Sequence, residues 1–241
     1  LKGMEGLYLE TGYRLNSHST YGTNSTYNIS PAYWIANRLK IFASFNTGFK
    51  SPTLSQLYGP FGANDKLEPQ VSQSTELGLN YISVDDRTDA QVTYYRRKID
   101  DLIDYSYDPG YFNRDRQEDE GVEILVNHRM FEKVNVTATY DFVTGKNYTL
   151  NESGEDTTIN NLIRRPKSKF SLNVNYQPVS RMNISLFGLY MGKRTDIFFD
   201  AANNYAETEV ALDPYFLLNA YVDYALLDGR VRAFADFKNI F

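Results

Sequence analysis

The stretch VNVTATYDF, residues 134–142, decides the fold class, because its side chains alternate without a break between apolar and polar. The apolar set is Val134, Val136, Ala138, Tyr140 and Phe142, and the polar set is Asn135, Thr137, Thr139 and Asp141. Successive side chains of a β-strand point to opposite faces, so this segment has one apolar and one polar face. We predict a strand here.

The same two-residue period recurs along nearly the whole chain, most clearly in residues 7–15, 39–50 and 169–176. Helical three-four spacing is not sustained anywhere. We count about eleven alternating segments, each close to the 9–11 residues that a tilted membrane strand requires. The fold class is therefore predicted to be all-β, an antiparallel meander of about eleven strands.

The connections between these segments alternate in length. The longer ones are predicted at residues 16–25, 51–72, 105–118, 144–166 and 194–213, and the shorter ones at 36–38, 84–87, 128–133, 177–180 and 227–229. Alternate connections of a meander lie at opposite ends of the sheet, so one end carries tight turns and the other long loops. Transmembrane β-barrels of the outer membrane have this asymmetry, whereas a soluble β-sandwich has no reason to keep it.

Aromatic residues mark both ends of the apolar faces. Tyr33, Tyr81, Tyr176 and Tyr224 stand near the short turns, and Tyr13, Phe45, Tyr94, Tyr140 and Tyr190 stand near the long connections. Two aromatic rows around an aliphatic band are typical of a membrane barrel, where the rings lie at the level of the lipid headgroups. Outer-membrane lipid is thus an expected partner.

Composition excludes several classes of function. The chain has 241 residues, a net charge of −5 and a pI of about 5.2, which argues against nucleic acid as a partner. Cysteine is absent, so a disulfide scaffold, a Cys-ligated zinc site and thiol catalysis are excluded. The two histidines, His18 and His128, stand in no catalytic or metal-ligand spacing. We expect no enzyme activity, no metal and no cofactor.

Five short motifs, in order along the chain, resemble one family. They are Gly48-Phe49-Lys50-Ser51-Pro52, Leu67-Glu68-Pro69-Gln70, Glu76-Leu77-Gly78, Gly121-Val122-Glu123 and Asn239-Ile240-Phe241. The set resembles the barrel of TonB-dependent outer-membrane receptors, although Gln70 stands where the family usually has Glu. Within the family, residues 94–96, 101–105 and 162–165 most resemble the vitamin B12 (cobalamin) receptors, and siderophore receptors share much of the pattern.

This resemblance implies a fold, a place and a function. The family's barrel has about 22 strands around a plug, and residues 1–241 match the C-terminal part of that barrel, about half of it. The plug, the first strands and the last strand have no counterpart here. The implied function is capture and import of a scarce solute across the outer membrane of a Gram-negative bacterium. The solute would be a corrinoid or a ferric siderophore, and TonB would supply energy through the plug.

Aromatic and arginine residues in the long connections are the predicted ligand-binding residues, because a bulky planar solute is held by such side chains. They are Tyr58, Phe61, Tyr105, Tyr107, Tyr111, Phe112, Arg114, Arg116, Arg194 and Tyr205. The sequence also leaves open a soluble all-β adhesin or carbohydrate-binding module. An outer-membrane barrel enzyme is a third alternative, which would require a nucleophile with a partnered histidine.

Overall fold

The computed structural model describes residues 6–106, 110–150, 156–159, 162–203 and 206–241. Its strands are β1 (Leu7–His18), β2 (Gly22–Ile35), β3 (Leu39–Lys50), β4 (Gln70–Ile82), β5 (Thr88–Tyr105), β6 (Tyr111–Met130), β7 (Val134–Leu150), β8 (Asp156–Ile159), β9 (Ser168–Tyr176), β10 (Met182–Met191), β11 (Arg194–Asp200), β12 (Ala206–Leu212), β13 (Tyr215–Leu226) and β14 (Val231–Phe237). The helical segments are α1 (Leu54–Tyr58), η1 (Ala201–Asn203) and η2 (Leu227–Gly229). No helix in the described ranges is long and apolar enough to cross a membrane.

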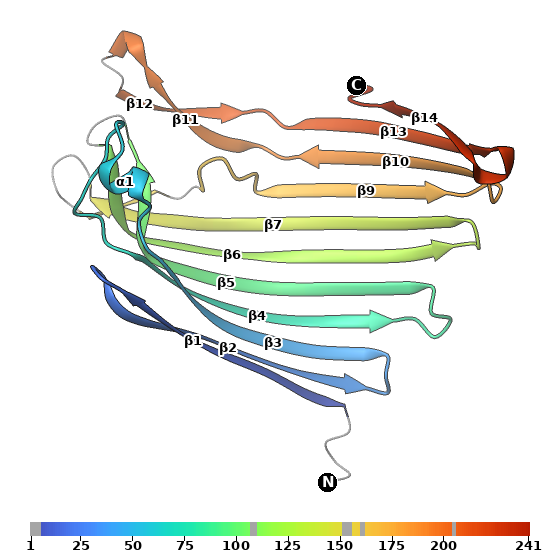
Figure 1. The fold of residues 1–241 in the computed structure, drawn as a ribbon, viewed down its shortest axis with the longest axis horizontal. Helices are drawn as coiled ribbons and strands as arrows, with labels where there is room; N and C mark the ends of the chain where they lie inside the picture. Colours follow the sequence, from blue (N-terminus) through green and yellow to red (C-terminus); the bar gives the residue numbers. More distant parts are fainter. Residues whose placement is uncertain (1–5, 107–109, 151–155, 160–161, 204–205) are drawn as a thin grey trace.

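The strands form one curved antiparallel meander (Figure 1). In the described part of the chain, eleven strands neighbour one another in the order β1-β2-β3-β4-β5-β6-β7-β9-β10-β13-β14, while β8 pairs with β7 and β11 with β12. The predicted all-β meander of about eleven strands is confirmed. Within the described residues the sheet is not closed, since β1 and β14 each have a neighbour on one side only.

The strand register sorts the side chains into two walls. One row across the sheet joins Gly78, Thr93, Glu123, Asp141 and Lys169, and we call this side the polar wall. The adjacent row joins Leu77, Tyr94, Val122, Phe142 and Ser168, and we call this side the apolar wall. A side-chain period of two keeps each wall uniform along the strands.

The usual burial pattern of a water-soluble protein is inverted. On the apolar wall Leu77 is 57% exposed, whereas Asp119 on the polar wall is only 2% exposed. Side chains on the concave face of a curved sheet converge and shield one another, so the polar wall is the concave one. Among the described residues no second sheet packs on the apolar wall, as a β-sandwich would require. Such an apolar outer surface matches the lipid-facing band of a barrel.

The aromatic residues lie where the sequence predicts them. Tyr33 stands opposite Ile41, and Tyr81 stands opposite Leu39, so both belong to the apolar wall at the short-turn end. Tyr140 stands opposite Phe170 towards the other end of the same wall. The register thus gives one aliphatic band with aromatic residues on both sides.

The short turns follow local chemistry and gather at one end of the sheet (Figure 1). Ala36 and Asn37, between β2 and β3, both have positive φ in a turn that the Arg38 N–H closes on the Ile35 carbonyl at 3.1 Å, and such a turn matches strand twist. Asp228 and Gly229, between β13 and β14, also have positive φ values, of 55° and 87°. Each turn reverses the chain within a few residues.

The predicted boundaries of all five long connections differ from the structure: β4 starts at Gln70 within 51–72, β7 runs to Leu150 within 144–166, and β11 and β12 occupy most of 194–213. The sequence predicts a loop at residues 16–25, but β1 runs to His18 and β2 starts at Gly22. It also predicts a loop at residues 105–118, yet β6 starts at Tyr111. Beyond the apolar band both faces are polar, so the alternation of hydropathy fades. Backbone pairing between neighbouring strands nevertheless continues.

Candidate functional site

The connection between β3 and β4, residues 51–69, lies at the long-loop end together with α1 (Figure 1), and we call it the docked loop. It begins with a capping box, in which the side chains of Thr53 and Gln56 each accept a hydrogen bond from the other residue's backbone N–H. Pro52 is buried and Leu67 is 1% exposed. The loop is thus a packed element with a fixed start.

Two glycines bring the docked loop against the hairpin of β5 and β6. Gly62 has φ +60° and Gly110 has φ +95°, and a Cβ on Gly62 would lie 2.7 Å from the Gly110 Cα. Only glycine allows this approach without strain. The Tyr111 backbone N–H donates to the Gly62 carbonyl at 2.8 Å, and the Asn64 Nδ2 donates to the Tyr111 carbonyl at 3.0 Å.

Asn113 on β6 holds the other end of the docked loop. Its Oδ1 accepts from the Glu68 backbone N–H at 2.9 Å, while its Nδ2 donates to the Glu68 carbonyl at 3.0 Å and to the Asp101 carbonyl at 2.8 Å. The Tyr21 hydroxyl, between β1 and β2, donates to the Leu67 carbonyl at 3.1 Å. Side chains from two hairpins therefore fix one loop.

Acidic groups crowd the place where the docked loop meets β5. Burial, followed by the charges of Asp100, Glu68 and Asp115, raises the pKa of Asp101 above its ordinary value. Asp101 also has a positive φ of 54°. The docked loop is therefore held by hydrogen bonds against a local like-charge repulsion.

The tip of the β5–β6 hairpin unites four of the predicted ligand-binding residues. Tyr105 and Tyr111 pair across the strands, with ring centroids 5.0 Å apart and edge-on geometry. The Arg114 guanidinium lies over the Phe112 ring at 5.2 Å and forms an ion pair with Asp104. Arg114 is only 6% exposed. Its guanidinium is therefore already paired within the tip and offers little surface to a solute.

The other predicted residues that the structure describes lie outside that cluster, in different settings. Tyr58 and Phe61, in the docked loop, are 72% and 78% exposed and so can meet a solute. Arg116 forms an ion pair with Asp100 at 3.0 Å, and both stand in the register of the apolar wall. Arg194 is at the start of β11, at the same end of the sheet. Tyr107 and Tyr205 lie outside the described residues.

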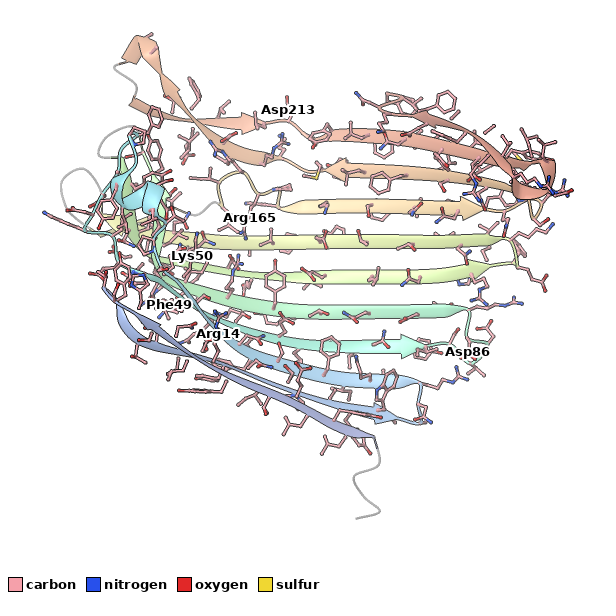
Figure 2. The ribbon with its side chains drawn as sticks, in the orientation of Figure 1. Arg14, Phe49, Lys50, Asp86, Arg165 and Asp213 are labelled. Atoms are coloured by element: carbon pink, nitrogen blue, oxygen red, sulfur yellow. The ribbon has the colours of Figure 1, made fainter. Side chains whose placement is uncertain are left out.

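A buried carboxylate organises the polar wall near the long-loop end. Asp119 accepts from Arg97 at 2.6 and 3.1 Å and from the Gln117 Nε2 at 2.8 Å. The Arg165 Nη1 lies 3.5 Å from the same carboxylate. Figure 2 places Arg165 at the end of the sheet that also carries Lys50, with Asp86 at the opposite end. This network is a fixed group of charged side chains on the polar wall, close to the long connections.

Sequence reasoning missed the residues that build this end. Nothing local distinguishes Asn64, Asn113 or Asp119 from other polar strand or loop residues. The basic run RRPKSK, residues 164–169, was an available signal, because so many cations in a short stretch indicate a local positive charge. No group of three or more metal-ligating side chains occurs in the part of the chain that the structure describes.

The family model described as "TonB dependent receptor-like, beta-barrel" matches residues 3–240. The chain belongs to this family of TonB-dependent receptors. The register, the inverted burial and the asymmetric ends described above are the structural features that this membership explains, and the predicted resemblance is confirmed.

Two curated relatives have similar sequences. The chain is 30% identical over 231 residues to "Vitamin B12 transporter BtuB" of Photobacterium profundum, covering 91% of this chain and 34% of the relative. It is 27% identical over 229 residues to the protein of the same name in Vibrio vulnificus, covering 91% and 33%. The chain therefore spans about a third of the length of the curated relatives that it matches.

Solved structures share the fold. A variant of the ferric enterobactin receptor PfeA of Pseudomonas aeruginosa superposes with a TM-score of 0.77 at 18% identity, covering 100% of this chain and 38% of that one. The ferripyoverdine receptor of the outer membrane of the same species gives a TM-score of 0.73 at 16% identity, covering 100% and 33%. These relatives are named as receptors or transporters, not as enzymes.

Proposed function

We propose that this chain is part of the barrel of an outer-membrane receptor of a Gram-negative bacterium, which captures a scarce solute and imports it. The observation that supports this most directly is the exposed apolar wall between two aromatic rows, in a chain of the TonB-dependent receptor family. As in that family, energy for import would come from TonB. The protein is not expected to break bonds.

Cobalamin is the solute that we propose first. The support is the name of the relatives at 27–30% identity, which match 91% of this chain. A ferric siderophore is the second candidate, because the structural neighbours include receptors for ferric enterobactin and ferripyoverdine. Those neighbours are 16–18% identical, so they support the fold and not the solute.

The long-loop end is the proposed capture surface. Tyr58, Phe61, Tyr105 and Tyr111 would offer aromatic faces to a large planar solute. Arg194 would add a charge from β11. Their arrangement rests on the docked loop, so ordering of that loop is part of the proposed site.

We also propose that residues 1–241 form the C-terminal part of a larger barrel, with a plug and further strands supplied by the rest of a longer protein. The free edges of β1 and β14 support this, because unpaired strand edges are not tolerated within a bilayer. The plug would be the route by which TonB acts.

Binding by the full-length receptor tests the function. The purified receptor in lipid nanodiscs should bind cobalamin by titration calorimetry, and ferric enterobactin and ferripyoverdine should bind far more weakly. Uptake of labelled cobalamin by cells that depend on this receptor should disappear when TonB is deleted. Binding of a ferric siderophore without cobalamin would favour the second candidate, and binding of neither class would overturn the proposal.

A further inference from the structure

A small basic cavity lies beside the charged network around Asp119 on the polar wall. Its volume is about 310 Å³, and it is formed by β7, the segment 162–167, the start of β11 and β12. Four of its lining side chains are basic: Arg165, Lys167, Lys193 and Arg194. The remaining lining residues include no Asp or Glu. A volume at the lower end of the range for small-molecule sites fits one group of a larger solute.

The cavity opens on the polar wall. Lys169 stands opposite Asp141 and Met191 in the register of that wall. Backbone bonds extend the pattern by two residues, since the Val143 N–H donates to the Lys167 carbonyl at 3.0 Å and the Lys167 N–H to the Lys193 carbonyl at 3.4 Å. With a period of two, Lys167 and Lys193 share the concave side with Lys169.

The positive charges of this cavity are poorly compensated. Arg165 reaches Asp119 at 3.5 Å, but that carboxylate already accepts two shorter bonds from Arg97. Within the described residues, Lys167 and Lys193 form no ion pair. The nearby Asp196 carboxylate is held by Arg164 at 2.6 Å.

One buried donor belongs to a residue that lines the cavity. The Arg194 Nη1 is shielded from solvent and has no hydrogen-bond partner among the described residues, while the guanidinium carbon lies 5.2 Å from the centre of the Tyr215 ring. A buried unpaired donor is costly, and a charged one more so. An anion that accepted from this nitrogen would remove that cost.

We infer that this basic cavity binds an anionic group of the transported solute, namely a phosphate ester, a carboxylate or a catecholate. Four clustered cations on the concave side of the sheet attract an anion, and arginine and lysine are its natural donors. The inference rests on the proposed function, since it assigns the cavity to the same solute. It adds Arg165, Lys167 and Lys193 to the capture surface.

The test compares two double variants of the full-length receptor in nanodiscs. Lys167→Gln with Lys193→Gln removes two charges from the cavity, and Lys133→Gln with Lys238→Gln removes two charges elsewhere. The probes are cobalamin, cobinamide (the corrinoid without the nucleotide and its phosphodiester) and ferric enterobactin. We expect the first variant to lose about tenfold or more in affinity for a bound anionic solute, with a weaker salt dependence. Cobinamide should bind both variants as it binds the unmodified receptor.

The outcomes separate the cavity from the function. Loss confined to cobalamin identifies a phosphodiester, and loss confined to ferric enterobactin identifies a catecholate. Equal affinities of both variants for a bound solute overturn the inference and leave the proposed function intact. If no solute binds, the proposed function fails, and titration with inorganic phosphate decides the cavity. The inference is supported if phosphate binding is lost in the Lys167→Gln, Lys193→Gln variant alone. It is overturned if phosphate binding is lost in both variants or in neither.

Discussion

The two ends of the sheet are built in different ways. At the short-turn end, reversals such as Ala36-Asn37 depend on residues adjacent in sequence, and the ion pair of Arg38 with Asp86 is largely in solvent. At the long-loop end, a whole connection packs against the neighbouring hairpin: the Asn113 Nδ2 donates to the Glu68 carbonyl, the Asn64 Nδ2 donates to the Tyr111 carbonyl, and Leu67 is 1% exposed. The first end reverses the chain, and the second assembles a surface.

This difference indicates which interactions contribute most to the free energy of unfolding. A solvent-exposed ion pair contributes little, because water screens it and side-chain entropy opposes it. A buried charge with several donors is costly to leave unpaired. Substitutions at the long-loop end should therefore have larger effects than matched ones at the short-turn end, and that contrast can be measured.

The largest difference between the two ends is expected when one ion pair at each end is broken. Asp119→Ala leaves Arg97 without its carboxylate and should lower the free energy of unfolding by about 3 kcal/mol. Asp86→Ala, which removes the exposed partner of Arg38, should cost less than about 1 kcal/mol. Guanidinium titrations of the full-length receptor in vesicles measure both. Equal costs would mean that the two ends do not differ in this respect.

Two glycines with left-handed backbone provide the next contrast. Gly62→Ala combines a strained φ with a Cβ 2.7 Å from Gly110, and should cost about 2–3 kcal/mol of docked-loop stability. Gly22→Ala has a similar φ of +69° but meets nothing within 4 Å, so it should cost about 1 kcal/mol and leave the loop in place. Limited proteolysis within residues 51–69 reports on the loop. Cleavage enhanced equally in both variants would refute the close contact.

The same contrast explains what could be predicted from sequence. Residues 134–142 reveal their faces because a strand's period is a local property, and turns such as Asp228-Gly229 carry their own chemistry. The pairing of Gly62 with Gly110 has no local signature, since glycine is common in loops for other reasons. The basic cavity joins β7 to residues 162–167 and 193–194, and only the folded sheet brings them together.

A smaller effect is expected for one side chain that clamps the docked loop. Asn113→Ala removes its three bonds to the Glu68 and Asp101 backbones, and should weaken docking by about 1 kcal/mol. Hydrogen exchange of the Glu68 amide measures this locally. Asn183→Ala is the control, because within the described part of the chain Asn183 donates to Asp223 alone, on the polar wall of β13. Unchanged protection of the Glu68 amide in the Asn113 variant would contradict the clamp.

The smallest of these effects depends on pH. Because the pKa of Asp101 is raised, chiefly by burial and then by Asp100, Glu68 and Asp115, its protonated form is favoured when the loop is docked. Docking should therefore be tightest at low pH and weaken as pH rises through the raised pKa. Protection of the Glu68 amide, corrected for intrinsic exchange, should increase from about pH 7 to about pH 4.

Asp101→Asn tests whether Asp101 is the group that causes this pH dependence. Asparagine tolerates the φ of 54° at this position, so the backbone should be preserved. The variant should show high protection of the Glu68 amide at neutral pH and a much smaller change on acidification. A pH dependence as large as that of the unmodified receptor would contradict the role of Asp101, and its protonation would then not limit docking.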